Sequence, residues 1–166
     1  MKGNDILTTE LLPFSEQSAR KAAEIMASGG IVGIPTETVY GLAADARNET
    51  AVHRIFEAKG RPQDNPLIVH ISGIEQLAPL VREIPGLALK IAEKYWPGPL
   101  TMIFPKSDMI PSATSGGLDT VAVRMPLSPA ARAIIDACGF PLAAPSANLS
   151  GSPSPTTAQH VFNDMN

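Results

Sequence analysis

Short hydrophobic runs alternate with helix-like patterns along this chain, and proline or glycine stands at most of the junctions between them. A run of a few apolar residues bounded by such breakers is typical of a short buried strand. The run at residues 67–71 is the clearest, and its nearly continuous apolar character predicts burial on both faces of a sheet. Further runs predict strands at residues 31–34, 100–104, 121–124 and 142–144.

Between these strands, apolar residues at helical spacing follow residues that commonly cap helices. Ser15, Asn48 and Ser128 are the expected caps of helices that end near residues 28, 58 and 138. Two more helices are expected at residues 87–95 and from residue 156 or 157 onward. Residues 36–42 and 112–117 are expected to be loops. Strands that alternate with helices predict an α/β fold.

The composition fits one globular domain, because the chain has 166 residues, of which 44% are hydrophobic and 17% charged. The formal net charge of -3 argues against a surface that is basic throughout. Cys138 is the only cysteine, which excludes an internal disulfide and favours a cytoplasmic protein. Residues 1–6 lack the apolar run of a signal peptide, and no apolar stretch approaches the ~20 residues that span a bilayer, so no membrane contact is expected.

A basic loop lies between an expected helix and the strand at 67–71. It contains Lys59, Gly60 and Arg61, followed by two prolines and Asn65. Lysine supplies a point charge and arginine a planar fork of donors, which suits a polyanion such as phosphate. Two interpretations stay open at this point, because cations are also favourable at the exposed carboxyl end of a helix.

A second polar loop follows the short run at 142–144 and contains Ser146 and Asn148. Serine and asparagine in loops usually hydrogen-bond their own backbone, which is the simpler interpretation. In open α/β sheets, however, ligands bind beyond the carboxyl ends of strands, and this loop directly follows one. Ser152, Ser154 and Thr156 add hydroxyl groups just before the last expected helix. The two loops together predict a phosphate-binding pocket.

Arg124 ends the Val-Ala-Val run, and a buried arginine is costly unless an anion compensates it. Its partner is expected to be either a protein carboxylate, with Glu37 as the candidate, or the anionic group of a ligand. His70 lies inside an apolar run and is either a structural histidine or a ligand contact. Thr36 and Thr38 are candidates for satisfying the backbone of their own loop.

Several chemistries are excluded by missing patterns in the sequence. There is no phosphate-binding loop with the Gly-x-x-x-x-Gly-Lys-Ser/Thr spacing and no serine nucleophile elbow. The three histidines, at positions 53, 70 and 160, lack metal-ligand spacing, so no protein-bound metal is expected. Cys138 has no obvious activating neighbour and is expected to be structural.

Taken together, six segments resemble the YrdC-like, Sua-type threonylcarbamoyl-AMP synthases, from about residue 15 to residue 166. The set is specific as a whole, although each piece alone is weak. The segments are residues 30–42 (GIVGIPTETVYGL), 59–62 (KGRP), 65–67 (NPL), 96–101 (WPGPLT), 120–126 (TVAVRMP) and 144–151 (APSANLSG).

The resemblance implies a YrdC-like α/β fold, a twisted mixed sheet with flanking helices and a large concave cavity. It implies that L-threonine, bicarbonate and ATP give threonylcarbamoyl-AMP and pyrophosphate, with Mg²⁺ accompanying the ATP. A separate transferase then moves the threonylcarbamoyl group to tRNA. The alternative function is an RNA-binding module for tRNA or double-stranded RNA in translation or ribosome assembly, and a third possibility is a carbamoyl-adenylate domain of the hydrogenase-maturation type.

Site residues are carried over position by position from the family's motifs. Lys59 and Arg61 match the basic signature that holds the ATP phosphates and count as the catalytic pair. The amino-acid end comprises Thr38, His70, Arg124 and Ala144, with Arg124 pairing with the threonine carboxylate. The nucleotide end comprises Lys59, Arg61, Asn65, Thr120, Ser146, Asn148 and Ser154.

The resemblance also bears on domain organisation. Family domains usually continue past the last residue of this chain into a further strand, and longer relatives carry an additional domain. Residues 1–166 are therefore expected to form a single domain that is truncated at its carboxyl end, with no second domain present.

Overall fold

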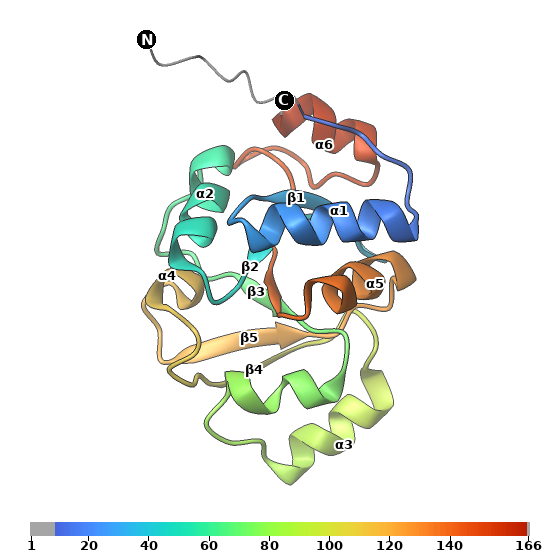
Figure 1. Cartoon of the computed structure of the whole chain (residues 1–166). Helices are drawn as coiled ribbons and strands as arrows, with labels where there is room; N and C mark the ends of the chain where they lie inside the picture. Colours follow the sequence, from blue (N-terminus) through green and yellow to red (C-terminus); the bar gives the residue numbers. More distant parts are fainter. Residues whose placement is uncertain (1–8, 166) are drawn as a thin grey trace.

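A mixed six-stranded sheet forms the centre of the computed structural model, which describes residues 9–165 (Figure 1). Residues 1–6, where no signal peptide was expected, lie outside the described residues. The strands follow the order β1-β2-β6-β3-β5-β4, and only β3 and β5 run parallel to each other. This arrangement confirms the predicted mixed α/β sheet. The strands are β1 (Val32–Pro35), β2 (Tyr40–Asp45), β3 (Ile68–His70), β4 (Thr101–Pro105), β5 (Thr120–Arg124) and β6 (Leu142–Ala143).

Three of the helices begin directly after the residues that were expected to cap them. The Ser15 side chain accepts a hydrogen bond from the Ser18 amide, Asn48 from that of Ala51, and Ser128 from that of Ala131. The α-helices are α1 (Glu16–Ala27), α2 (Glu49–Lys59), α3 (Gly86–Tyr95), α4 (Ser112–Ser115), α5 (Pro129–Cys138) and α6 (Ala158–Met165), and two short 3₁₀ helices are η1 (Ile74–Gln76) and η2 (Ala78–Leu80). None of the helices in the described part of the chain is long and apolar enough to cross a membrane.

Two loop predictions were wrong. Tyr40 to Leu42 belong to β2, which pairs antiparallel with the neighbouring β1, and the Tyr40 and Leu42 amides donate on the other edge to the Pro155 and Pro145 carbonyls of distant segments. Residues 112–115 form α4, where the buried Thr114 hydroxyl donates to the Ala46 carbonyl at 2.8 Å. In both places tertiary partners, which local sequence does not reveal, decide the conformation.

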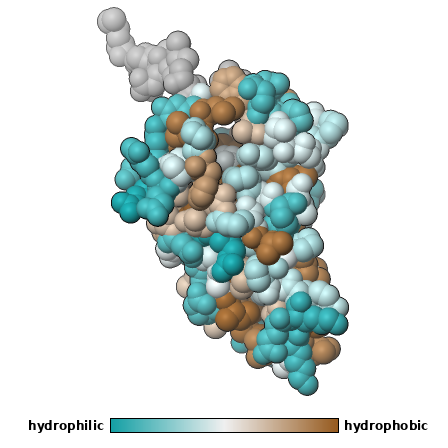
Figure 2. Space-filling model, turned by 90° about the vertical axis from the view of Figure 1, so that its right-hand side faces the viewer, coloured by the Kyte–Doolittle hydropathy of each residue, from teal (hydrophilic) through white to brown (hydrophobic). Residues whose placement is uncertain are grey.

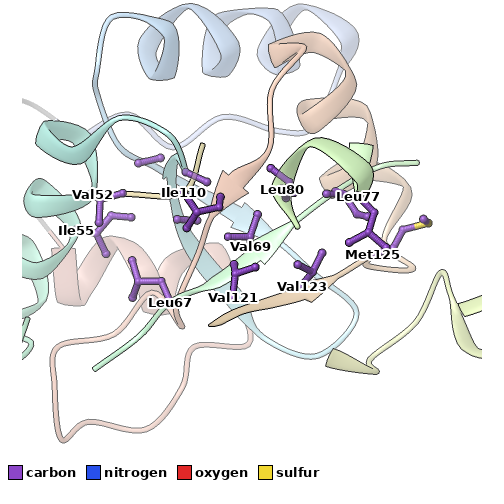
Figure 3. Close-up of a cluster of buried hydrophobic side chains, with 14 of the residues drawn as sticks. Val52, Ile55, Leu67, Val69, Leu77, Leu80, Ile110, Val121, Val123 and Met125 are labelled. Atoms are coloured by element: carbon purple, nitrogen blue, oxygen red, sulfur yellow. The ribbon is translucent and has the colours of Figure 1, made fainter. Parts of the chain in front are cut away.

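The main hydrophobic core lies against one face of the sheet. Val69 of β3 and Val121 and Val123 of β5 point into it, where they meet side chains of α2 and of the η1–η2 segment (Figure 3). A second, smaller core lies on the opposite face, where α1 and α5 cover Ala43, Leu142 and Ala144. The two cores account for the alternation of inward and outward residues along the strands.

The second face is covered only at the β1, β2 and β6 side of the sheet. Side chains that alternate with the core valines, such as Ile68 and Ala122, are only partly buried. Ile103, on the edge strand β4, is 70% exposed. In the described part of the chain this half of the sheet is therefore open, and the strand register decides which side chains it presents.

The molecular surface mixes polar and apolar side chains. On the side drawn in Figure 2, hydrophobic residues lie in separate patches among polar ones. A hollow of about 340 Å³ is formed by Ser152–Thr156 together with His160, Asn163 and Asp164 of α6. The large concave cavity that the family resemblance implies stays a prediction.

The turn between Lys59 and Arg61 depends on a glycine. Gly60 caps α2 with a φ of 57°, in the left-handed region, and a Cβ atom there would meet nothing within 4 Å. Gly60→Ala should therefore cost about 1 kcal/mol of unfolding free energy through backbone strain alone. Gly86→Ala, at the exposed start of α3, has equal space without a positive φ and should stabilise by a few tenths of a kcal/mol. Urea unfolding of both variants tests this, and equal effects would contradict it.

Candidate functional site

Arg124, the last residue of β5, lies on the open face and is 9% exposed. Its Nη2 donates to Glu37 Oε1 at 2.7 Å, and both Nη1 and Nη2 donate to Thr38 Oγ1 at 3.2 Å. Its Nε donates to the Gly98 carbonyl at 3.3 Å. Of the two partners left open by the sequence, the structure places a protein carboxylate, Glu37, against this guanidinium.

The ion pair between Glu37 and Arg124 is itself largely buried, with side chains 19% and 10% exposed. Burial alone raises the pKa of Glu37, but hydrogen bonds from Arg124 and from the Glu37 and Leu127 backbones, with the Arg124 charge, hold this pKa below its usual range. The pair therefore stays ionised at neutral pH, and each charge compensates the other.

The turn between β1 and β2 carries Glu37 and Thr38 over Arg124. Thr36 closes this turn, since its amide and its hydroxyl both donate to the Val39 carbonyl, at 3.3 and 2.6 Å. Thr36 Oγ1 also lies 3.1 Å from Thr38 Oγ1. Thr36 therefore satisfies the backbone of its own loop, as expected, whereas Thr38 faces the arginine.

His70 is the neighbour of Arg124 in the register between β3 and β5. It is 3% exposed, and its Nδ1 lies 3.2 Å from the Ile68 carbonyl. Burial and the Arg124 charge lower the pKa of His70 to about 4, although Ile68, Glu37 and Leu142 oppose this shift. At neutral pH His70 is therefore an uncharged imidazole beside the ion pair.

Lys59, at the end of α2, is 2% exposed, and its ammonium donates to the Ser146 and Asn148 carbonyls. Burial and the charge of Arg61 lower the pKa of Lys59 to about 8, with Asp164 opposing. The interpretation of Lys59 as a solvated cation at a helix terminus is therefore wrong. Its reach across the protein joins the two loops that the sequence predicted to act together.

Arg61 lies half-buried beside this contact. Its Nη2 donates to the Pro66 carbonyl at 3.3 Å, and burial lowers its pKa. Two buried polar atoms here have no hydrogen-bond partner among residues 9–165: Arg61 Nε and Asn148 Oδ1. The Asn148 Nδ2, in contrast, donates to the Leu149 and Ser152 carbonyls at 2.8 Å. A buried donor and a buried acceptor without partners are features that a ligand can satisfy.

The strand register places the remaining candidates on the same face. Ala144 lies beside Ile68, to whose carbonyl its amide donates at 3.0 Å, and Thr120 starts the strand that Arg124 ends. Four residues of extended strand separate Thr120 from Arg124 by about 13 Å. Because β6 runs antiparallel to β3, the loop that contains Ser146 lies toward the end of β5 at which Thr120 begins the strand. Lys59, which donates to this loop, lies at the same end. The site thus has two separate polar ends along the strand direction.

The predicted residues are not all joined to these ends by hydrogen bonds. Thr38, His70 and Arg124 gather at one end, and Lys59 and Arg61 lie near Ser146 and Asn148 at the other. Asn65 is exposed in the basic loop, and Ser154 is exposed in the wall of the small hollow. Within the described residues no side-chain hydrogen bond connects Asn65 or Ser154 to either group.

Gly98 was missed by sequence reasoning, because its backbone carbonyl, and not a side chain, holds Arg124. The available signal was a glycine between two prolines. A Cβ atom at this position would lie 2.5 Å from the Tyr95 carbonyl oxygen, so only glycine fits. Glu37 was named only as a candidate partner of Arg124, since its place in a turn gave no indication of burial.

The neutral state of His70 makes the stability of the fold depend on pH. The unfolded chain binds a proton at His70 near pH 6.5, whereas the folded protein does so only near pH 4. The contribution of His70 to the free energy of unfolding is therefore at its maximum above pH 6.5. It decreases by about 3 kcal/mol as the pH falls from 6.5 to 4. His70→Asn should flatten that part of the profile in urea unfolding, and His160→Asn, on the exposed face of α6, should not. Identical profiles for His70→Asn and wild type would contradict the assignment.

The family model Sua5_yciO_yrdC, described as "Telomere recombination", matches residues 24–166. A threonylcarbamoyl-AMP synthase of Pyrococcus abyssi is 56% identical over 150 residues, which cover 90% of this chain and 44% of that protein. A threonylcarbamoyl-AMP synthase of Bacillus subtilis is 50% identical over 158 residues, with 95% and 46% covered.

The fold has a solved counterpart of similar sequence. The crystal structure of P. abyssi Sua5 complexed with L-threonine superposes with a TM-score of 0.89 at 55% identity, covering 92% of this chain and 45% of that one. This chain thus spans about half the length of these relatives.

Proposed function

Because this chain belongs to the Sua5/YciO/YrdC family, we propose that it forms the catalytic domain of an L-threonylcarbamoyladenylate synthase. The reaction converts L-threonine, bicarbonate or CO₂, and ATP into threonylcarbamoyl-AMP and pyrophosphate. The observation that carries the proposal is the pair of polar ends, which lie apart along the strand direction. Arg124, which is buried and suited to a carboxylate, ends β5, and the two cations suited to phosphates lie toward the opposite end of that strand, where Thr120 begins it.

The amino-acid end is assigned to Arg124 and its surroundings. Arginine presents two parallel N–H donors that match a carboxylate, and Arg124 is held in place by Gly98. Thr38, which lies in the fork of the guanidinium, supplies a hydroxyl that can accept or donate. Neutral His70 supplies a polar wall without adding charge, and Ala144 leaves room for the small threonine side chain. This end therefore suits a short polar amino acid.

The nucleotide end is assigned to the two loops joined by Lys59. Arg61 has an unpartnered Nε and is expected to donate to a phosphate oxygen. Lys59 positions the loop and adds positive charge from beneath it, and in the catalytic pair it helps to neutralise the phosphates. Asn65, Thr120, Ser146, Asn148 and Ser154 are proposed contacts to the rest of ATP.

The chemistry needs little covalent help from the protein. The threonine amine captures carbon dioxide to form a carbamate, and a carbamate oxygen attacks the α-phosphorus while pyrophosphate leaves. Holding the two substrates in line and neutralising the phosphate charge supply the acceleration. Magnesium is proposed to enter with ATP, whose phosphate charge it would help to neutralise.

The wider setting follows from the proposed product. A separate transferase would move the threonylcarbamoyl group to tRNA, which would place the protein in the cytoplasm. We also propose that residues 1–166 act as one domain, to which longer relatives add further chain.

The proposed activity predicts threonine-dependent release of pyrophosphate. The chain, incubated with ATP, magnesium and bicarbonate, should release pyrophosphate only when L-threonine is added, since the carbamate is the nucleophile. A coupled pyrophosphate assay measures this, and D-threonine serves as the control. Release that is independent of threonine, or no release despite measurable binding of both substrates, would contradict the proposal.

The two ends predict opposite effects of two arginine variants. Arg61→Ala should weaken ATP binding about 10- to 100-fold and leave threonine binding unchanged, because a charge-assisted hydrogen bond contributes about 1.5–3 kcal/mol. Arg124→Ala should weaken threonine binding and leave ATP binding unchanged. Calorimetric titration with each ligand separates these effects.

The matched control is Arg82→Ala, which removes an exposed arginine whose backbone amide pairs with the Pro105 carbonyl, away from both ends. This variant should bind both ligands as the wild type does. If Arg61→Ala and Arg124→Ala instead weaken both ligands equally, the assignment of two separate ends is wrong.

A further inference from the structure

The guanidinium of Arg124 is already engaged by the protein itself. Thr38 Oγ1 lies at 3.2 Å from both Nη1 and Nη2, in the fork that a carboxylate would occupy, and Glu37 Oε1 takes another N–H of Nη2 at 2.7 Å. A ligand carboxylate can therefore bind in bidentate fashion only by sharing or replacing these contacts. Glu37 is the charged one of these two partners. The electrostatic cost of binding therefore depends on whether Glu37 keeps a cation next to it when the ligand binds.

A second carboxylate at this position would leave the site with one uncompensated negative charge. The Glu37 side chain is 19% exposed, although the residue as a whole is exposed, so water screens its charge only in part. Arg124 is the one cation that acts on the Glu37 carboxyl among the described residues, and the adjacent His70 is neutral at pH 7. Something in the ligand itself must therefore restore the charge balance.

An α-amino acid brings that compensation with it. Its ammonium group is attached to the carbon next to the carboxylate, so both charges reach the Glu37–Arg124 pair together. The second Glu37 oxygen accepts a long 3.4 Å contact from the Ser128 amide, and the Glu37 and Leu127 backbones also hydrogen-bond the carboxyl group. A carboxylate oxygen with such weak partners can still accept from a ligand. A zwitterion can thus replace one ion pair by two, whereas a plain carboxylate leaves Glu37 without a cation.

We propose that Glu37 is a specificity-determining residue, which binds the ammonium group of the substrate while Arg124 binds its carboxylate, so that the site selects zwitterionic amino acids over plain carboxylates. This inference rests on the proposed function, because it takes the Arg124 end to be the amino-acid site. Selection arises from the penalty that an unpaired buried carboxylate imposes on the wrong ligand.

The test compares two ligands that differ in the amino group alone. L-threonine and (R)-3-hydroxybutyrate share the carboxylate, the hydroxyl and the methyl group, and the second lacks the ammonium. Their dissociation constants are measured by calorimetry, the weaker ligand by competition against threonine. In Glu37→Gln the threonine affinity should fall about 10-fold or more, while that of 3-hydroxybutyrate should stay equal or rise. The ratio of the two affinities should therefore shrink at least about 10-fold.

Two variants control for indirect effects. Glu37→Asp keeps the charge and should retain most of the preference for threonine. Glu93→Gln removes an exposed carboxylate on α3 and should leave the ratio at its wild-type value. Because the readout is a ratio, a variant that is partly unfolded changes both affinities by the same factor and does not imitate the expected result.

Each outcome decides between the proposals. An unchanged ratio in Glu37→Gln, including an equal loss for both ligands, means that Glu37 merely supports Arg124, and it overturns the inference alone. A wild-type protein that binds neither ligand overturns both the inference and the proposed function. A wild-type protein that prefers threonine through Glu37 but releases no pyrophosphate supports the inference and contradicts the activity.

Discussion

The ion pair between Arg124 and Glu37 ties together segments that are 87 residues apart in the sequence. Arg124 carries its charge at the end of a central strand, where only a tenth of the side chain reaches solvent. A charge in that position requires a partner, since an uncompensated buried ion costs several kcal/mol. The requirement fixes the turn between β1 and β2 over the sheet, and it orders the backbone at Gly98, whose carbonyl accepts from the same guanidinium.

Lys59 meets the same requirement by a different route. Its ammonium is nearly inaccessible, yet within residues 9–165 it donates to two main-chain carbonyls and to no carboxylate. Carbonyl dipoles compensate a cation less fully than a carboxylate does, in agreement with a pKa that burial lowers to about 8. The Arg124 end of the site is therefore neutral overall, and the other end retains the positive character of Lys59 and Arg61. An anionic ligand is attracted to the second end first.

Much of the fold could be predicted from sequence because local signals were strong. Capping residues at positions 15, 48 and 128 marked helix starts correctly, and apolar runs marked five of the strands. The strand at Tyr40–Asp45 was missed although its first residues pair with the adjacent β1, because polar residues 36–39 precede it and its other edge is held by the Pro155 and Pro145 carbonyls, more than 100 residues away. Propensity carries no information about such partners.

The sequence predicted the Arg124 end of the site better than the Lys59 end. The position of Arg124 at the end of an apolar run predicted that it would need an anionic partner. Only the strand register in the structure shows that His70 lies beside it. Lys59 was misleading, because a lysine at a helix end is usually solvated and this one crosses to a loop 87 residues away. Burial depends on which segments pack together, so sequence spacing alone could not distinguish a solvated lysine at a helix end from a buried one such as Lys59.

A site whose charges are already satisfied by the protein binds its ligand by exchange. The observed affinity is then the free energy of the ligand's own interactions with the site, less that of the internal interactions which it displaces at Glu37, Thr38 or the loop carbonyls. Such a difference is small even when each interaction is strong, so the affinity for a correct ligand is moderate. A ligand that lacks one group forgoes the matching interaction and still has to break the internal one. Exchange therefore favours discrimination over tight binding, as the proposed choice of one amino acid from many would require.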